Sequence, residues 1–225
     1  MTIPARPLRP ELVVVGFPRG AELRRRLPRL LAGVACLGFG IGLTVRARLG
    51  LSPWDVLHQG LADVTGLSFG TVVIALGIVI LLAWIPLHQR MGLGTVVNTL
   101  GAGLITDLTL ALVGEPVGAA ARWGLLAAGI VTVALGIGLY IGSGLGPGPR
   151  DGLMTSIAAR GHPIWAVRTG LELGALGAGW LLGGDVGVGT VVFALWIGPL
   201  GHIFLSRLHL GLGASDPDPE AAFGE

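Results

Sequence analysis

The stretch LGLSPWDVL, residues 49–57, returns in altered form as LGPGPRDGL at residues 145–153, with Leu, Gly, Pro, Asp and Leu in the same places. Two further motifs repeat around it. GIGL occurs at 40–43 and again at 136–139, and GLGTVV at 92–97 matches GVGTVV at 187–192. Because the three matches keep their order and nearly constant spacing, the sequence predicts a tandem duplication. The first repeat covers 29–113 and the second 122–207.

The composition is typical of a membrane protein rather than of a soluble domain. The chain has 225 residues, of which 52% are hydrophobic and 12% charged, whereas roughly a quarter of a soluble domain is charged. Six apolar segments are long enough, or nearly so, to cross a bilayer. They are Leu30–Val45, Leu67–Leu87, Gly94–Val113, Trp123–Ile141, Ile164–Leu182 and Val188–Leu205. We therefore expect an all-α polytopic bundle of about six transmembrane helices, with the lipid bilayer as its main partner.

The number of spans and the positions of the arginines predict the topology. Three spans in each repeat mean that the second copy enters the bilayer from the opposite side, which gives two inverted repeats. The segment 1–28 is rich in Arg, and such flanks stay in the cytoplasm. We expect both termini on the cytoplasmic side of a bacterial plasma membrane, with 208–225 as a disordered acidic tail. The arginines are not interleaved with an aromatic stripe, so nucleic-acid binding is not expected.

The repeated turn has the form of a helix start. Ser52 can be the N-cap, Pro53 suits the first helical position, and Asp55 is the third residue. In the second repeat these places are taken by Gly148, Pro149 and Asp151. Each repeat should therefore contain a break and a short helix, either interfacial or re-entrant, in addition to its three spans. In the first short helix, Trp54, Leu57, Leu61 and Val64 form an apolar stripe, and the polar residues lie mostly off it.

Two interpretations of Asp55 and Asp151 remain open. The carboxylates can cap their helices and compensate the helix dipole. Alternatively, the broken helices place free N–H groups and carboxylates at the edge of a polar cavity.

Ionisable side chains inside the apolar segments are the other candidates for function, because a charge at the bilayer centre costs from about 3 to above 10 kcal/mol. Arg168 and Glu172 are four residues apart and can pair on one helix face. Asp107 and His202 hold matching places in the two repeats, and Asn98 adds a polar group near the start of the third span. Each of these residues can form a structural hydrogen bond or ion pair, or it can line a substrate or ion pathway. The glycines, among them Gly170 and Gly174, are expected to let helices approach closely.

The doubled LG-x-x-P-x-D-x-L motif, the preceding GIGL and the G-x-GTVV opening of the third span resemble the YczE/YitT-type family of bacterial integral membrane proteins. The resemblance covers roughly residues 29–207. It implies a multi-span bacterial membrane protein, and it transfers no catalytic or binding residue.

We expect a small transporter or permease of unknown substrate, with a polar cavity between the repeats and with Glu172 or Asp107 exchanging protons. The alternative is a non-transporting scaffold or accessory subunit, including a substrate-capture subunit. The sequence has no G-x-S-x-G, H-E-x-x-H or P-loop motif and a single Cys. It therefore predicts no enzyme, no cofactor and no metal. The small size of the chain is compatible with a homodimer.

Overall fold

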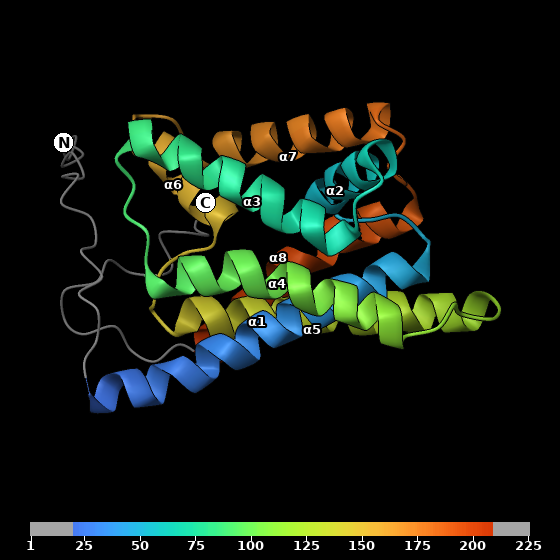
Figure 1. Cartoon of the computed structure of the whole chain (residues 1–225), viewed down its shortest axis with the longest axis horizontal. Coiled ribbons are helices and arrows are strands. Elements are labelled where there is room, and N and C mark those ends of the chain that lie inside the picture. The colour runs from blue at the N-terminus through green and yellow to red at the C-terminus, as the bar shows by residue number, and fades with distance from the viewer. Residues whose placement is uncertain (1–19, 209–225) are drawn as a thin grey trace, which may run out of the picture.

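The computed structural model describes residues 20–208, and this part of the chain folds into eight α-helices (Figure 1). Six long helices run along the long axis of the molecule, and the two short helices α2 and α6 lie toward opposite ends. The elements are α1 (Ala21–Ala47), α2 (Pro53–Thr65), α3 (Phe69–Leu87), α4 (Leu93–Leu112), α5 (Ala119–Gly142), α6 (Pro149–Ala158), α7 (Ile164–Leu181) and α8 (Val188–Leu208).

The long helices coincide with the six apolar segments predicted from the sequence. One difference is that α1 begins at Ala21, inside the Arg-rich stretch, rather than at Leu30. Five helices, α1, α3, α4, α5 and α8, are long and apolar enough to cross a membrane. The remaining long helix, α7, is not among them, and it carries Arg168 and Glu172. Most of the predicted 1–28 segment and the 208–225 tail, except residues 20–28 and Leu208, lie outside the described residues.

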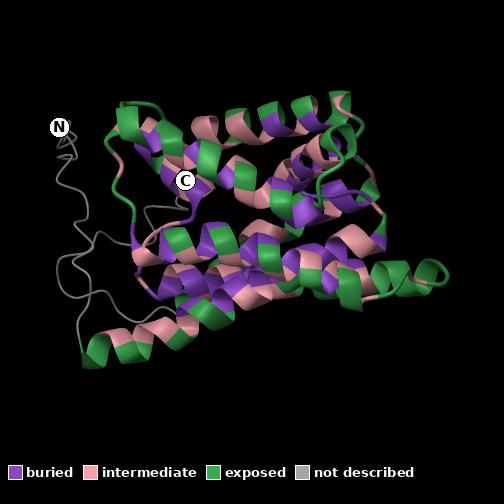
Figure 2. Cartoon of the chain, viewed as in Figure 1, coloured by how far each residue is buried: buried purple, intermediate pink, exposed green. Residues whose placement is uncertain are grey.

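The centre of the molecule is a close crossing of α1 and α5. A Cβ atom added to Gly33 would lie 3.0 Å from the carbonyl oxygen of Gly136, and one added to Gly40 would lie 2.8 Å from that of Gly129. Only glycine permits backbones to approach this closely. Helix α4 packs on α1 and α8 packs on α5. The buried residues accordingly concentrate along this group of helices (Figure 2).

The repeated sequence motifs contact each other across the two halves. The loop before α2 docks on the start of α8, where the N–H of Gly189 donates to the carbonyl of Leu49 over 2.6 Å. The loop before α6 docks on the start of α4, where the N–H of Gly94 donates to the carbonyl of Leu145 over 2.7 Å. Each G-x-G-T motif thus binds the L-G turn of the other half, with its own first N–H groups as donors.

The short helices also cross between the halves, since α2 packs on α7 and α6 packs on α3. At the α3–α6 contact the buried Trp84 lies against Gly152, and its indole N–H donates to the carbonyl of Pro149 over 3.1 Å. At the α2–α7 contact Gly179 lies against the backbone of Val56 and Leu57. A glycine therefore allows close packing at both contacts, against the Trp84 ring in one and against the backbone of α2 in the other.

The two halves differ in how their last helices associate. Helix α3 packs along α4, but α7 does not pack along α8 to a comparable extent. The predicted packing face at Gly170 and Gly174 has no heavy atom within 4 Å of a Cβ added at either position. These two glycines do not bring helices together within the described chain, in contrast to the glycines of α1 and α5.

Candidate functional site

The first turns of α2 and α6 meet inside the molecule. Trp54 is in the first turn of α2 and Arg150 is in the first turn of α6. The guanidinium carbon of Arg150 lies over the Trp54 ring, 5.7 Å from its centroid, within the range of a cation–π contact. Two helix N-termini, each a positive dipole end, therefore point toward one region.

A cavity of about 30 Å³ lies beside this meeting point, enough for one or two water molecules. Its lining comes from both halves and includes residues of α1, α2, α3, α4 and α6. The polar side chains in the lining are His58, Asn98, Thr99 and Arg150.

Asp55 and His58 form a buried pair on the inward face of α2. Asp55 is 2% exposed and His58 is 4% exposed. The Ser52 hydroxyl donates to Oδ2 of Asp55 over 2.6 Å, and Nδ1 of His58 lies 3.1 Å from Oδ1. Val64, which belongs to the apolar stripe predicted for this helix, is instead 65% exposed. The buried residues of α2 are Asp55, Val56, His58 and Gly60, and none of them belongs to the stripe.

The environment fixes the ionisation of this pair at neutral pH. Burial lowers the pKa of His58 below its ordinary value, against the opposing effect of Asp55. Burial alone would raise the pKa of Asp55, but the hydrogen bond from His58, the charge of Arg150 and the hydrogen bond from Ser52 lower it overall. We therefore assign a carboxylate to Asp55 and a neutral ring to His58. Its Nδ1–H donates to Asp55, which leaves Nε2 as a hydrogen-bond acceptor.

Asp151 matches Asp55 in the sequence but has a different partner. The hydroxyl of Tyr140, which is 3% exposed, donates a short hydrogen bond to the Asp151 carboxylate. Neither Asp55 nor Asp151 belongs to the cavity lining. Both carboxylates therefore lie outside the cavity lining, and each accepts a hydrogen bond from a neighbouring side chain.

Two lining side chains have no such partner. Asn98 is 7% exposed and lines the cavity, and no hydrogen bond of its amide to another residue is present within residues 20–208. Arg150 has intermediate burial and forms no ion pair with any described residue. Its guanidinium lies over the Trp54 ring, and its charge also acts on Asp55 and His58.

The remaining sequence candidates lie away from the cavity. Asp107 holds the start of α3, because Oδ2 accepts from the Ser68 hydroxyl over 2.5 Å and Oδ1 accepts from the N–H of Gly70 over 2.7 Å. Arg168 and Glu172 form an ion pair on α7 with 3.0 Å between Nε and Oε1. Their side chains are about one third exposed, at 38% and 35%.

His202 is exposed on α8. At the two helix breaks, Ser52 and Gly148 are the N-caps, and Pro53 and Pro149 are the first helical residues.

Sequence reasoning did not select His58, Arg150 or Tyr140. His58 lies one turn after Asp55, so the spacing that allows their contact was visible in the sequence. Arg150 occupies the place of Trp54 in the second copy of the turn, and Tyr140 is the one tyrosine in the chain. Their contacts cross between distant segments, which no local pattern indicates.

Comparison with known proteins gives one family and a small set of relatives. The model of a family of unknown function, DUF6198, matches residues 24–206. The chain is 40% identical over 178 residues to an uncharacterised protein of Haemophilus influenzae, covering 79% of this chain and 82% of the relative. It is 35% identical over 184 residues to the uncharacterised membrane protein YczE of Bacillus subtilis, covering 79% and 84%. No solved structure matches the chain.

Proposed function

The chain belongs to the membrane-protein family of unknown function DUF6198, and we propose that it works as a small permease with a substrate site between two inverted repeats. The observation that carries this proposal is the cavity beside the first turns of α2 and α6, whose mostly apolar lining includes the polar side chains of His58, Asn98, Thr99 and Arg150. Transporters commonly bind their substrates at the N-termini of broken helices near the interface of two repeats. The cavity, the paired helix starts and the lining from both halves fit that arrangement.

Reciprocal contacts support the inverted repeat. Gly33 approaches Gly136 while Gly40 approaches Gly129, and each pair links the same two places of the repeat in opposite order. The docking of each L-G turn on the other half's G-x-G-T motif follows the same rule. Such an exchange of equivalent partners is what a twofold axis produces. If each half crosses the membrane three times, the axis lies in the membrane plane.

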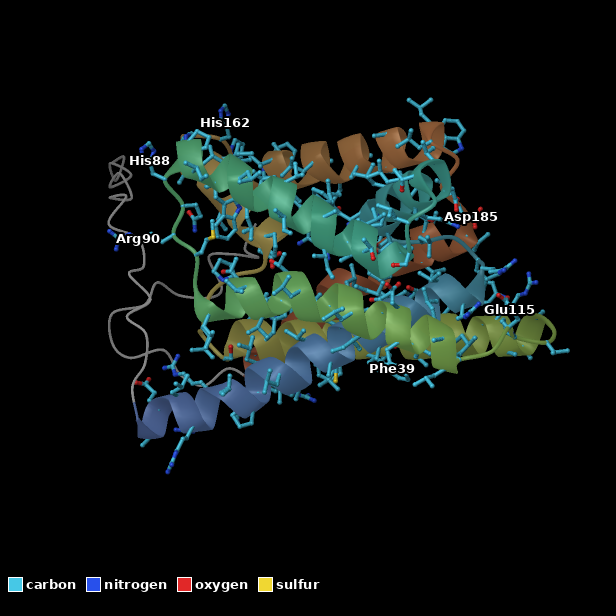
Figure 3. The ribbon with its side chains drawn as sticks, in the orientation of Figure 1. Phe39, His88, Arg90, Glu115, His162 and Asp185 are labelled. Atoms are coloured by element: carbon cyan, nitrogen blue, oxygen red, sulfur yellow. The ribbon has the colours of Figure 1, made fainter. Side chains whose placement is uncertain are left out.

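The distribution of charges supports an orientation in the bacterial plasma membrane. His88, Arg90 and His162 lie at one end of the molecule, and Glu115 and Asp185 lie at the other (Figure 3). The end with His88 and Arg90 also holds the Arg-rich start of α1. Under the positive-inside rule this end is cytoplasmic.

The last two long helices are held together in the first half and not in the second, and this difference supports alternating access. In the first half, Asp107 ties α4 to the first turn of α3 through Ser68 and Gly70. In the second half, Pro163 is the N-cap of α7 and His202 takes the place of Asp107, so no such tie forms. We propose a second conformation that opens to the other side of the membrane. In it α7 packs on α8, and α3 is released from α4.

We propose that His58, held by Asp55, is the proton-exchanging group. Glu172 and Asp107, the proton-exchanging residues expected from the sequence, do not line the cavity, whereas His58 does. The charged groups near the His58 ring are Asp55 on its own helix and Arg150 on α6. Asp55 stabilises the imidazolium that forms on protonation, and Arg150 opposes it.

The test is solute flux by the purified protein in proteoliposomes that contain a pH-sensitive dye. A panel of sugars, amino acids, small carboxylates and inorganic ions is added one by one. We expect one class to give saturable, protein-dependent flux with a coupled pH change. His58→Gln should abolish the pH change, whereas His162→Gln, at an exposed loop position, should not. Absence of flux with every class, together with co-purification of a stoichiometric partner, would support the accessory-subunit alternative instead.

A further inference from the structure

We propose that the cavity beside Arg150 binds a small monovalent anion, of the size of a halide ion or formate. This inference rests on the permease proposed above and names the chemical class of its substrate. It follows from the charge, the hydrogen-bonding groups and the size of the cavity.

The charge of the lining is positive. Arg150 is the one charged side chain in the lining, because His58 is neutral there. The neighbouring acids are already engaged, Asp55 by Ser52 and His58 and Asp151 by Tyr140. The Arg150 charge also acts on the Asp55 carboxylate, but the guanidinium forms no ion pair within residues 20–208, and an anion in the cavity would give it a direct partner.

Asn98 gives independent evidence for a ligand. Its amide is more than nine-tenths buried, lines the cavity, and has no hydrogen-bond partner among residues 20–208. The amide borders the cavity, so a ligand there can supply the hydrogen-bond partner that the described residues do not. The neighbouring Thr99 is not available as a donor, because its hydroxyl already donates to the carbonyl of Thr95 over 2.7 Å. The Asn98 NH₂ group can donate to an anion held by Arg150.

The first turn of α6 provides a third set of donors. Its N-cap, Gly148, has no side chain to cap the helix, and Pro149 has no N–H of its own. In α2, by contrast, the Ser52 side chain accepts from the N–H of Asp55. No side chain caps the first N–H groups of α6, and the helix dipole favours an anion beside them.

The volume limits the ion. A cavity of about 30 Å³ holds one or two water molecules. The one cationic side chain in the lining, Arg150, balances one negative charge. The fit is best for a halide or a formate-sized anion, and poor for a sugar acid.

The test is calorimetric titration of the purified protein in detergent with sodium chloride, sodium formate and sodium nitrate. Sodium gluconate is the large-anion control and keeps the ionic strength constant. We expect saturable binding of at least one small anion and none of gluconate. Arg150→Gln and Asn98→Leu should each weaken binding about tenfold or more, because each removes a donor to a charged group. Arg122→Gln, at an exposed arginine of α5, is the matched control and should bind as the unsubstituted protein does.

Two further measurements separate this inference from the permease proposal. Thermal unfolding shows whether each variant is folded. The tryptophan emission should shift on anion binding in the unsubstituted protein and not in Trp54→Phe, because Arg150 lies over the Trp54 ring. Flux of a cation or neutral solute that is unchanged in Arg150→Gln would overturn the anion site and leave the permease standing. Anion binding that depends on Arg150, without flux of any anion in proteoliposomes, would support the anion site and overturn the permease. No binding of any of the three anions by a folded protein would overturn the inference directly.

Discussion

At the scale of single residues, the two copies of the Gly-Pro-Asp turn have diverged into two different hydrogen-bonded pairs. Asp55 pairs with His58 within α2, whereas Asp151 accepts from Tyr140 at the end of α5. The sequence could indicate that both acids begin a helix, because capping is local. It could not indicate the Tyr140 contact or the position of Arg150 over Trp54, because these partners come together only through the packing of separate helices.

Removal of the Asp55 charge should destabilise the protein and impair proton coupling. In Asp55→Asn the buried His58 ring and the Ser52 hydroxyl lose a charged hydrogen-bond partner, and we expect a loss of about 1–3 kcal/mol in the free energy of unfolding. Thermal or denaturant unfolding in detergent measures the loss. Asp63→Asn, at an exposed position of the same helix, is the control. Equal stability of the two variants would contradict the role of Asp55 described here.

The Asp55–His58 pair also predicts the pH dependence of stability. The pKa of His58 is lowered in the folded protein from its ordinary 6.5, so the unfolded chain binds this proton more readily. Stability should therefore fall as the pH drops below about 6.5, down to the folded pKa. The lowered pKa of Asp55 acts in the same direction at lower pH. Unfolding at pH 7.5 and pH 5 measures the change, and it should be smaller in His58→Gln. A protein that is more stable at pH 5 would contradict the assignment.

At the scale of the helices, the hydrophobic pattern predicted where each helix lies in the sequence better than it predicted which face of the helix is buried. The six apolar segments became α1, α3, α4, α5, α7 and α8 with ends that mostly agree within a few residues, because burial in lipid depends on local composition. The apolar stripe of α2 is not its buried face, and the sequence pattern did not predict which face of this helix is buried. Inward apolar stripes are expected when water surrounds a protein, but in a membrane the polar residues Asp55 and His58 face the interior.

The contact between α3 and α6 predicts which glycines are essential to packing. A side chain at Gly152 would collide with the buried ring of Trp84. We expect Gly152→Val to cost about 1–3 kcal/mol, as overpacking of a filled interior does. Gly174→Ala on α7 meets no atom within 4 Å and should leave the stability of the monomer nearly unchanged. Thermal unfolding in detergent compares the two, and a smaller loss in Gly152→Val than in Gly174→Ala would contradict the packing.

At the scale of the whole molecule, the two repeated motifs contact each other across the two copies. The duplication could be predicted from the sequence because the motifs recur in order. Their function could not, because each G-x-G-T motif binds the L-G turn of the other copy and not its own. The reciprocal contacts hold the loops that precede α2 and α6, and so they fix where the two helix starts meet beside the cavity.

Helix α3 is tied to α4, whereas α7 is not tied to α8, and this difference predicts how the second half moves. Trp165 and His202 correspond in the repeat to Gly70 and Asp107, the places where α3 and α4 are tied. If the second half closes in the opposite-facing state, cysteines at 165 and 202 should cross-link in membranes, in a Cys36→Ser background. Asp107→Ala removes the tie at α3 and should raise the cross-linked fraction several-fold, since a loss of 1.4 kcal/mol shifts a two-state equilibrium about tenfold. Asp63→Ala, which leaves the tie intact, should not change it. A cross-linked fraction that is equal in Asp107→Ala and Asp63→Ala would mean that the tie does not hold the protein in one state, and alternating access by exchange of these contacts would be wrong.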